Sequence, residues 1–198
     1  MTLLRRRRDM TRDAFSAHWV GPHAEIARRY PGLLRYVQNH VVRRLDPATV
    51  DDFECDGMAE LWFADDAAMR AALDSPVAQE LIVDEPRFLT GVTGMILGDA
   101  PAGPPLGGMK VIVLGRAVPG ARIEVGSVQG MLNGSMARVQ ATYRRDALWV
   151  VPNPPDTILV AHFATPSLAH AAIDSGVWPQ AGTLDTWHAY QVDEFRVV

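Results

Sequence analysis

The spacing of apolar and polar residues in the first half of the chain predicts a short strand, a helix, two strands, a second helix and a closing strand. Residues 3–4 end the first strand. Apolar or ring side chains then recur at steps of three and four, which marks one helical face: Phe15, Trp19, His23, Ile26 and Tyr30. Alternation predicts strands over 34–42 and 58–63, then a helix capped by Asp65 and a strand over 94–97. This β-α-β-β-α-β order is the ferredoxin-like pattern.

The second half repeats the pattern less completely. Strands are predicted over 110–114, 138–144, 158–163 and 190–197. Thr165 is placed to cap a helix that has Pro166 at its first position. Residues 119–134 are rich in glycine and lack a helical stripe, so a short or irregular helix is expected there.

A direct repeat links the two halves. Residues 63–77 recur at 163–177, with Phe, Ala, Asp, Ser and Val matching at a constant offset. A stretch rich in proline and glycine separates the copies, so we expect a first unit over 1–98, a linker over 99–108 and a degenerate second unit over 109–198. The predicted fold class is α+β, with two ferredoxin-like β-α-β-β-α-β units.

Composition narrows the classes of function. The chain has 198 residues, of which 48% are hydrophobic and 21% charged, as in ordinary globular proteins. A net charge of −4 argues against a nucleic-acid partner. No apolar run approaches the roughly 20 residues of a membrane span, so no membrane partner is expected. Cys55 is the single cysteine, which fits a reducing cytoplasm.

The bare face of such a sheet must be buried against something. Residue parity assigns two sets of strand residues to two faces. One set is expected beneath the helices: Val37, Val41, Ala59, Leu61 and Phe63. The other set is expected to face the second half and to line an enclosed pocket: Tyr36, Gln38, His40, Met58, Glu60 and Trp62. On this interpretation His40 and Glu60 face each other across adjacent strands and exchange protons.

Several of these residues also carry a resemblance. The first half resembles the EthD domain family. The resemblance rests on His18-Trp19, His23, the run from Pro31 to His40, Glu60-Leu61-Trp62-Phe63, Asp74-Ser75-Pro76 and Arg87-Phe88-Leu89. The resemblance covers residues 1–98, and the second half shares it only through the repeat. It implies the dimeric α+β barrel superfamily, in which two ferredoxin-like units pack sheet to sheet. For two units in one chain, the resemblance implies that they pack sheet to sheet as an intrachain α+β barrel. It also implies cofactor-free acid–base chemistry on lactones or phenolic compounds, or an accessory role in the degradation of ethers or aromatics.

The candidate site follows from both arguments. His40 is the expected general acid or base, Glu60 its partner carboxylate, and Tyr36 a hydrogen-bond donor to a substrate oxygen. The expected substrate-binding residues are Gln38, Trp62, Asn39, His23 and His162. Asn39 is expected to point toward the helices and to orient His23. A structural role is the alternative for each of these side chains, and for His23 it is favoured.

No metal and no cofactor are expected. His18 and His23 are five residues apart, about 140° around an α-helix, so they should not share a ligand; His18 is expected on the helix surface. We therefore predict a lyase, isomerase, cyclase or dehydratase acting on a small cyclic or aromatic carbonyl compound. The alternatives are a non-catalytic protein that holds a hydrophobic metabolite, and a haem or oxygen enzyme. The expected partners are a small-molecule substrate and a second copy of the intrachain barrel.

Overall fold

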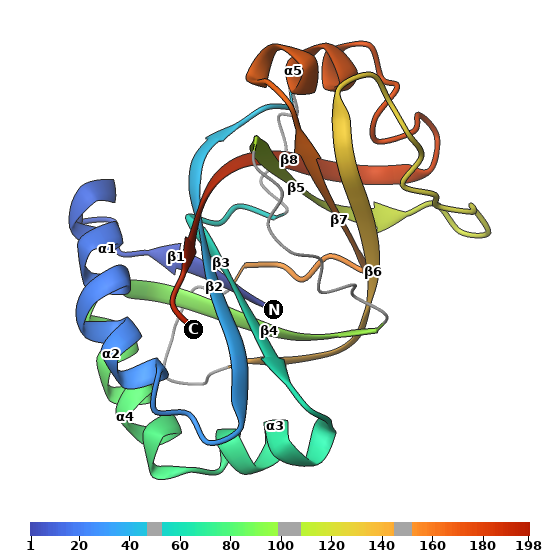
Figure 1. Cartoon of the computed structure of the whole chain (residues 1–198). Coiled ribbons are helices and arrows are strands. Elements are labelled where there is room, and N and C mark those ends of the chain that lie inside the picture. Colours follow the sequence, from blue (N-terminus) through green and yellow to red (C-terminus); the bar gives the residue numbers. More distant parts are fainter. Residues whose placement is uncertain (47–52, 99–107, 145–151) are drawn as a thin grey trace.

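The computed structural model describes residues 1–46, 53–98, 108–144 and 152–198. Over these residues the chain is an α+β protein built on a closed antiparallel barrel of eight strands (Figure 1). Residues 99–107, which make up most of the expected linker, lie outside the described residues.

The first half contains every element that its sequence predicts. In chain order these are β1 (Thr2–Arg6), α1 (Arg12–His18), the π-helix η1 (Trp19–His23), α2 (Ala24–Ala27), β2 (Leu33–Arg44), β3 (Gly57–Phe63), α3 (Asp66–Leu73), α4 (Pro76–Asp84), the 3-10 helix η2 (Glu85–Arg87) and β4 (Leu89–Gly98). Helix α4 was not predicted. It begins where the preceding helix was expected to end, because Ser75 caps it by accepting a hydrogen bond from the Ala78 amide and a proline suits its first position.

The second half keeps the strands and one helix. Its elements are β5 (Met109–Ala117), β6 (Met131–Arg144), β7 (Thr157–Phe163), α5 (Pro166–Asp174) and β8 (Leu184–Arg196). The Thr165 cap of α5 is confirmed, since its hydroxyl accepts a hydrogen bond from the Leu168 amide. Residues 118–130 form turns and coil instead of a helix, in keeping with the glycines found there.

The barrel closes in the order β1-β3-β2-β8-β5-β7-β6-β4. Within it, the first half contributes the run β4-β1-β3-β2, and the second half contributes the corresponding run β8-β5-β7-β6. Two antiparallel pairings join the halves, β2 with β8 and β4 with β6. Because both junctions are backbone ladders, the barrel has no free strand edge.

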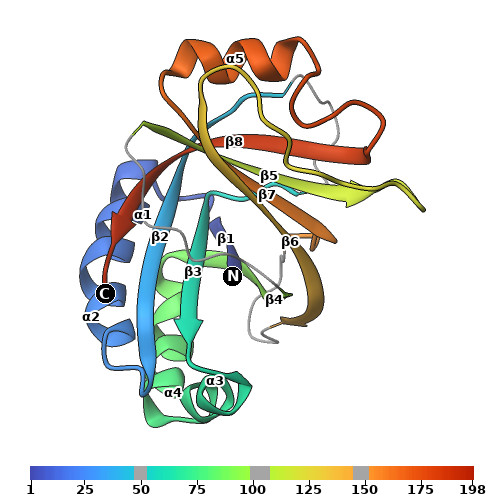
Figure 2. The same cartoon turned by 45° about the vertical axis from the view of Figure 1, so that its right-hand side comes forward.

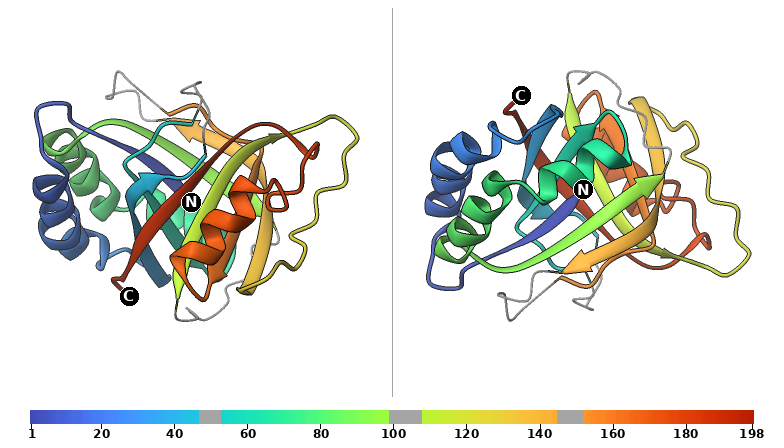
Figure 3. Two further views of the ribbon diagram at one scale, coloured as in Figure 1. Left: turned by 90° about the horizontal axis from the view of Figure 1, so that it is seen from above. Right: turned by 90° about the horizontal axis from the view of Figure 1, so that it is seen from below.

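The helices lie outside the barrel on two different sides. Helices α1, α2 and α4 cover the strands of the first half, and α5 covers those of the second half (Figures 1 and 2). Three apolar clusters result: one beneath the first-half helices, one beneath α5, and one inside the barrel. Seen from above, α1 and α2 lie well apart from α5 (Figure 3). None of the described helices has the length and apolar character needed to cross a membrane.

Candidate functional site

The pairing of β2 with β3 decides which side chains share a face. Tyr36 lies opposite Leu61, and Gln38 opposite Ala59. Partners in an antiparallel ladder point to the same side of the sheet, so Tyr36, Gln38 and His40 lie beneath the helices with the odd-numbered residues of β3. Glu60 points into the barrel. The expected pair of His40 and Glu60 is therefore wrong, because the two side chains lie on opposite faces.

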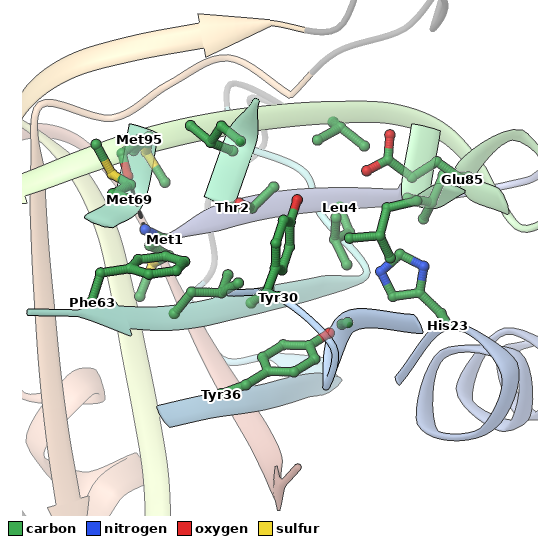
Figure 4. Close-up of a pocket in the computed structure, with 17 residues that line it drawn as sticks. Met1, Thr2, Leu4, His23, Tyr30, Tyr36, Phe63, Met69, Glu85 and Met95 are labelled. Carbon is green, nitrogen blue, oxygen red and sulfur yellow. Dashed lines mark hydrogen bonds between the residues drawn. The ribbon is translucent and has the colours of Figure 1, made fainter. Parts of the chain in front are cut away.

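A cavity of about 90 Å³ lies between the first-half strands and their helices. We call it the helix-side cavity. Its wall is mainly apolar, and its polar lining residues are Thr2, His23, Tyr30, Tyr36 and Glu85. His23 and Glu85 lie at one end of it, and Met1, Met69, Met95 and Phe63 at the other (Figure 4). Of the predicted site residues, this cavity brings together Tyr36 and His23.

A buried carboxylate holds His23. Asp84, at the end of α4, lies 3.0 Å through Oδ2 from Nδ1 of His23 and 3.1 Å through each oxygen from Nε2 of His18. Burial alone would raise the pKa of Asp84, but the hydrogen bonds from His23 and His18 outweigh it and hold that pKa below its usual range. A carboxylate that accepts from Nδ1 fixes the ring orientation and the tautomer of His23.

Both histidines reach Asp84 because the helix changes its winding between them. Trp19–His23 forms a π-helix, in which hydrogen bonds join residues five apart. A spacing of five residues is then about one turn, and His18 and His23 share a face. The expectation that His18 lies on the helix surface is wrong: its ring stacks on Phe88 with the ring centroids 4.7 Å apart.

A chain of hydrogen bonds links the β2 residues on the helix side. Nε2 of Gln38 lies 2.8 Å from the Trp19 carbonyl oxygen and 3.0 Å from Oη of Tyr36, and Nε1 of Trp19 lies 2.9 Å from the same Oη. Nε2 of His40 lies 3.2 Å from Oε1 of Gln38, and Nδ1 of His40 lies 2.9 Å from Oγ of Ser16. Burial raises the pKa of Tyr36, so its hydroxyl stays protonated.

His40 lies among aromatic rings. The centroid of its ring is 4.4 Å from that of Trp19 and 4.7 Å from that of Phe195. Gly57 lies opposite His40 and makes room for Trp19, because a Cβ there would overlap the indole ring. Burial lowers the pKa of His40 to about 4, so the ring is neutral at pH 7.

Because of His40, the free energy of unfolding should decrease as the pH is lowered. Its pKa is about 4 in the folded protein against 6.5 for an ordinary histidine, so the unfolded chain takes up the proton first as the pH falls below 6.5. We expect a loss on the order of 2 kcal/mol in the free energy of unfolding between pH 7 and pH 4, after allowance for partial solvent access. Urea denaturation of wild type and His40→Gln measures it. Equal losses in the two proteins would contradict the assignment.

A second polar group, the barrel cluster, lies inside the barrel. It consists of Asn39, Glu60, Lys110 and Glu194. Nζ of Lys110 lies 2.7 Å from Oε1 of Glu60 and 2.6 Å from Oε2 of Glu194. Nδ2 of Asn39 donates to Oε1 of Glu60 over 2.7 Å and to the Met58 carbonyl over 3.0 Å. The expected contact of Asn39 with His23 is therefore wrong, and Asn39 orients Glu60 instead.

His162 and Trp62 lie near this cluster and away from the helix-side cavity. His162 is opposite Lys110 in the β5–β7 ladder, and its Nδ1 lies 2.8 Å from Oδ1 of Asn133. Burial, and then the charge of Lys110, lower the pKa of His162. Trp62 carries the Arg35 guanidinium over its ring at 4.5 Å and lines an outer cavity of about 340 Å³ together with Glu60.

The two cavities adjoin each other. Their linings share five residues: Met1, Leu61, Phe63, Met69 and Met95. Three of the five are methionines, whose flexible side chains rearrange easily. In the described parts of the chain, no group of three or more His, Cys, Asp and Glu side chains is placed to hold a metal ion.

Most of the residues that line the helix-side cavity lie in a segment that matches a family model. Residues 7–91 match the model of the EthD domain. By this match, the segment 7–91 is similar to the EthD domain. The EthD match includes His23, Tyr36, His40 and Asp84, and it ends before the Met95 wall of the cavity. No curated protein matches the sequence.

Solved structures resemble the whole chain. An anthrone oxidase-like protein superposes with a TM-score of 0.61 at 10% identity, covering 99% of this chain and 91% of that one. A protein assigned as a monooxygenase from Lactobacillus acidophilus NCFM gives a TM-score of 0.47 at 11% identity, over 100% of this chain and 92% of that one. The first likeness extends the shared fold beyond the EthD-like segment into the second half, and at this identity it speaks for the fold alone.

Proposed function

We propose that the EthD-like segment is an acid–base catalyst that removes a proton from a small cyclic or aromatic carbonyl or phenolic compound bound in the helix-side cavity. One observation carries the proposal. The same cavity wall holds an imidazole oriented by a buried carboxylate and a phenol whose oxygen accepts a hydrogen bond from an indole. A positioned base beside an oxygen-binding donor is the arrangement that enolisation requires.

In the proposed step, His23 takes a proton from a carbon next to the carbonyl group, or from a phenolic oxygen. The electron pair of the broken C–H bond moves to the carbonyl oxygen and gives an enolate, whereas that of a broken O–H bond stays on the oxygen and gives a phenolate. Tyr36 donates a hydrogen bond to this oxygen. Asp84 holds Nδ1 of His23 and stabilises the imidazolium that forms. The role of base therefore passes from His40 to His23, because His23 lines the cavity and His40 does not.

Several reaction classes begin with this step. Return of the proton to another carbon is an isomerisation, loss of a neighbouring oxygen substituent is an elimination catalysed by a lyase or dehydratase, and attack of the enolate on a second carbonyl is a cyclisation. Reaction of the carbanion with dioxygen is an oxidation, and a structural neighbour carries the name anthrone oxidase-like. Proton removal is the common element, so it is the step to measure.

The size of the cavity supports a small ligand. Its volume of about 90 Å³ is smaller than the roughly 150 Å³ of an engineered cavity that admits benzene. A ring therefore requires movement of the methionine wall, of which Met69 and Met95 are part. The same apolar wall favours a second candidate, a non-catalytic protein that holds a hydrophobic metabolite for a partner enzyme.

We also infer that the barrel is a tandem of two ferredoxin-like units, residues 1–98 and 109–198. The corresponding strand order of the two halves and the repeat of 63–77 at 163–177 support this division. The first unit then holds the chemistry, and the second completes the barrel.

The test is exchange of substrate protons for deuterium. Wild type in D₂O is mixed with 2-indanone, 2-tetralone, anthrone or an unsaturated γ-lactone, and NMR follows loss of the acidic C–H signal. We expect enzyme-dependent exchange with at least one compound. His23→Gln should slow it about 10²–10³-fold and Tyr36→Phe about 10²-fold. His170→Gln, the same substitution on α5, should behave as wild type.

Two other results decide between the candidates. Compounds that bind, as seen by thermal shift, but show no exchange would establish the non-catalytic binding protein. Neither binding nor exchange across the panel would remove the cavity as a functional site.

A further inference from the structure

We infer that Tyr36 can only donate a hydrogen bond into the helix-side cavity, and that a one-way chain of hydrogen bonds through Gln38 and His40 imposes this. The cavity therefore selects ligands that present an accepting oxygen at Tyr36: a carbonyl, an enolate or a phenolate. Gln38 and His40 are positioning residues. The inference rests on the site of the proposed function, and it holds whether or not proton removal follows.

Gln38 sets the direction of the hydrogen-bond chain. Its Nε2 lies 2.8 Å from the carbonyl oxygen of Trp19. A carbonyl only accepts hydrogen bonds, so the amide nitrogen must face it, and the opposite orientation of the amide would set two acceptors against each other. The same Nε2 lies 3.0 Å from Oη of Tyr36, so it donates to that oxygen as well. Gln38 is fully buried, which makes these partners obligatory.

The orientation of Gln38 fixes the protonation of His40. Oε1 of Gln38 lies 3.2 Å from Nε2 of His40 and only accepts, so Nε2 carries the proton. The low pKa of His40 keeps the ring neutral at pH 7, and Nδ1 is then an acceptor. It takes the proton of the Ser16 hydroxyl, which lies 2.9 Å away. Every donor in the chain thus points from Ser16 toward Tyr36.

Tyr36 ends the chain. Its oxygen accepts from Nε2 of Gln38 and from Nε1 of Trp19, and an indole nitrogen only donates. Both acceptor sites of the phenol oxygen are then occupied. What Tyr36 can still offer is its own O–H, and Tyr36 lines the helix-side cavity. The two incoming donors also polarise this O–H and strengthen the bond that it gives.

A pair of probes of equal shape tests the selection. Cyclohexanone presents a carbonyl oxygen where methylenecyclohexane presents a CH₂ group. Calorimetry gives both dissociation constants for wild type and for Tyr36→Phe. Relative to Tyr36→Phe, wild type should favour the ketone about tenfold, the usual contribution of one hydrogen bond. An unchanged ratio, or a wild type that binds neither probe, would overturn the inference. Deuterium exchange reports the proposed reaction independently of this ratio.

A separate measurement tests the positioning roles of Gln38 and His40. It is the carbonyl stretching frequency of bound ¹³C-labelled cyclohexanone. A donated hydrogen bond lowers this frequency. We expect a low frequency in wild type and a rise toward the value in apolar solvent in Tyr36→Phe and Gln38→Leu. His40→Leu should show a partial rise. His40→Gln should stay low, because its amide N–H can replace the donor to Gln38.

The two substitutions at His40 guard against misfolding. Both remove the imidazole, and only one keeps a donor, so a difference between them reports the hydrogen bond and not the loss of the ring. The same low frequency in His40→Leu and Gln38→Leu as in wild type would overturn the positioning roles. A frequency in wild type equal to that in Tyr36→Phe would overturn the donor role of Tyr36.

Discussion

Replacing Asp84 by asparagine should slow deuterium exchange about 10²–10⁴-fold, while the affinity for ligands in the helix-side cavity changes little. The Asp84 carboxylate accepts from Nδ1 of His23 and from Nε2 of His18. An asparagine side chain replaces one carboxylate oxygen by an NH₂ donor and carries no negative charge to stabilise the imidazolium. If its amide nitrogen faces His23, Nδ1 becomes the acceptor and Nε2 takes the proton, which is the wrong tautomer for a base.

His18→Gln is the matched control. It removes the other imidazole from Asp84 and leaves the bond to His23 in place, and His18 does not line the cavity. We expect its exchange rate to stay within about threefold of wild type, apart from the loss of its stacking on Phe88. Equal slowing in His18→Gln and Asp84→Asn would mean that Asp84 acts by packing the helix and not by orienting His23. Michaelis constants and rates at saturation separate the two effects.

Much of the fold follows from local patterns. Strands of alternating polarity and capped helices are properties of short windows, and Asp65 and Thr165 cap helices as predicted. Which side of the sheet a strand residue faces is not a property of a short window. They depend on how β2 is registered against β3, and a shift of one residue exchanges the two faces. The pairing of Asn39 with Met58 reverses the parity on which the expected contact between His40 and Glu60 relied.

The shared contact of His18 and His23 with Asp84 was missed for a related reason. A spacing of 3.6 residues per turn separates His18 from His23, whereas the π-helix aligns them. Gly21-Pro22 between them is the one signal in the sequence, since proline removes a donor from the helical ladder. Asp84 left a trace as well: it follows Ala78 and Leu81 at steps of three, which places a carboxylate on the buried face of α4.

The contacts of Lys110 and Glu194 in the barrel cluster could not be predicted from the sequence. Lys110 and Glu194 meet Glu60 only because the ladder between β2 and β8 closes the barrel. Contacts between residues of such distant segments leave no periodic pattern. The repeat nevertheless gave a partial indication: Val160 stands where Glu60 stands in the first copy, so the two halves cannot contribute equally to the barrel interior.

Lys110→Ala should lower the free energy of unfolding by about 3 kcal/mol, because it leaves two carboxylates in the barrel without their cation. Nζ of Lys110 lies 2.7 Å from Glu60 and 2.6 Å from Glu194, and the lysine is 6% exposed. The estimate takes the lower end of the usual range for breaking a buried pair, since both carboxylates keep some contact with solvent. Denaturation in urea at pH 7 measures it.

The matched variant replaces the whole triad, with Lys110→Met, Glu60→Leu and Glu194→Leu together. Apolar side chains of similar volume bring no desolvation cost, so we expect a stability within about 1 kcal/mol of wild type, or above it. The difference between the single and the triple variant then separates the cost of an unpaired charge from the value of the ion pairs themselves. If Lys110→Ala alone costs less than about 1 kcal/mol, water reaches the cluster and the barrel interior is open at this end. Because Lys110 and Glu60 come from different halves, such a result would also mean that the cluster contributes little to holding the halves together.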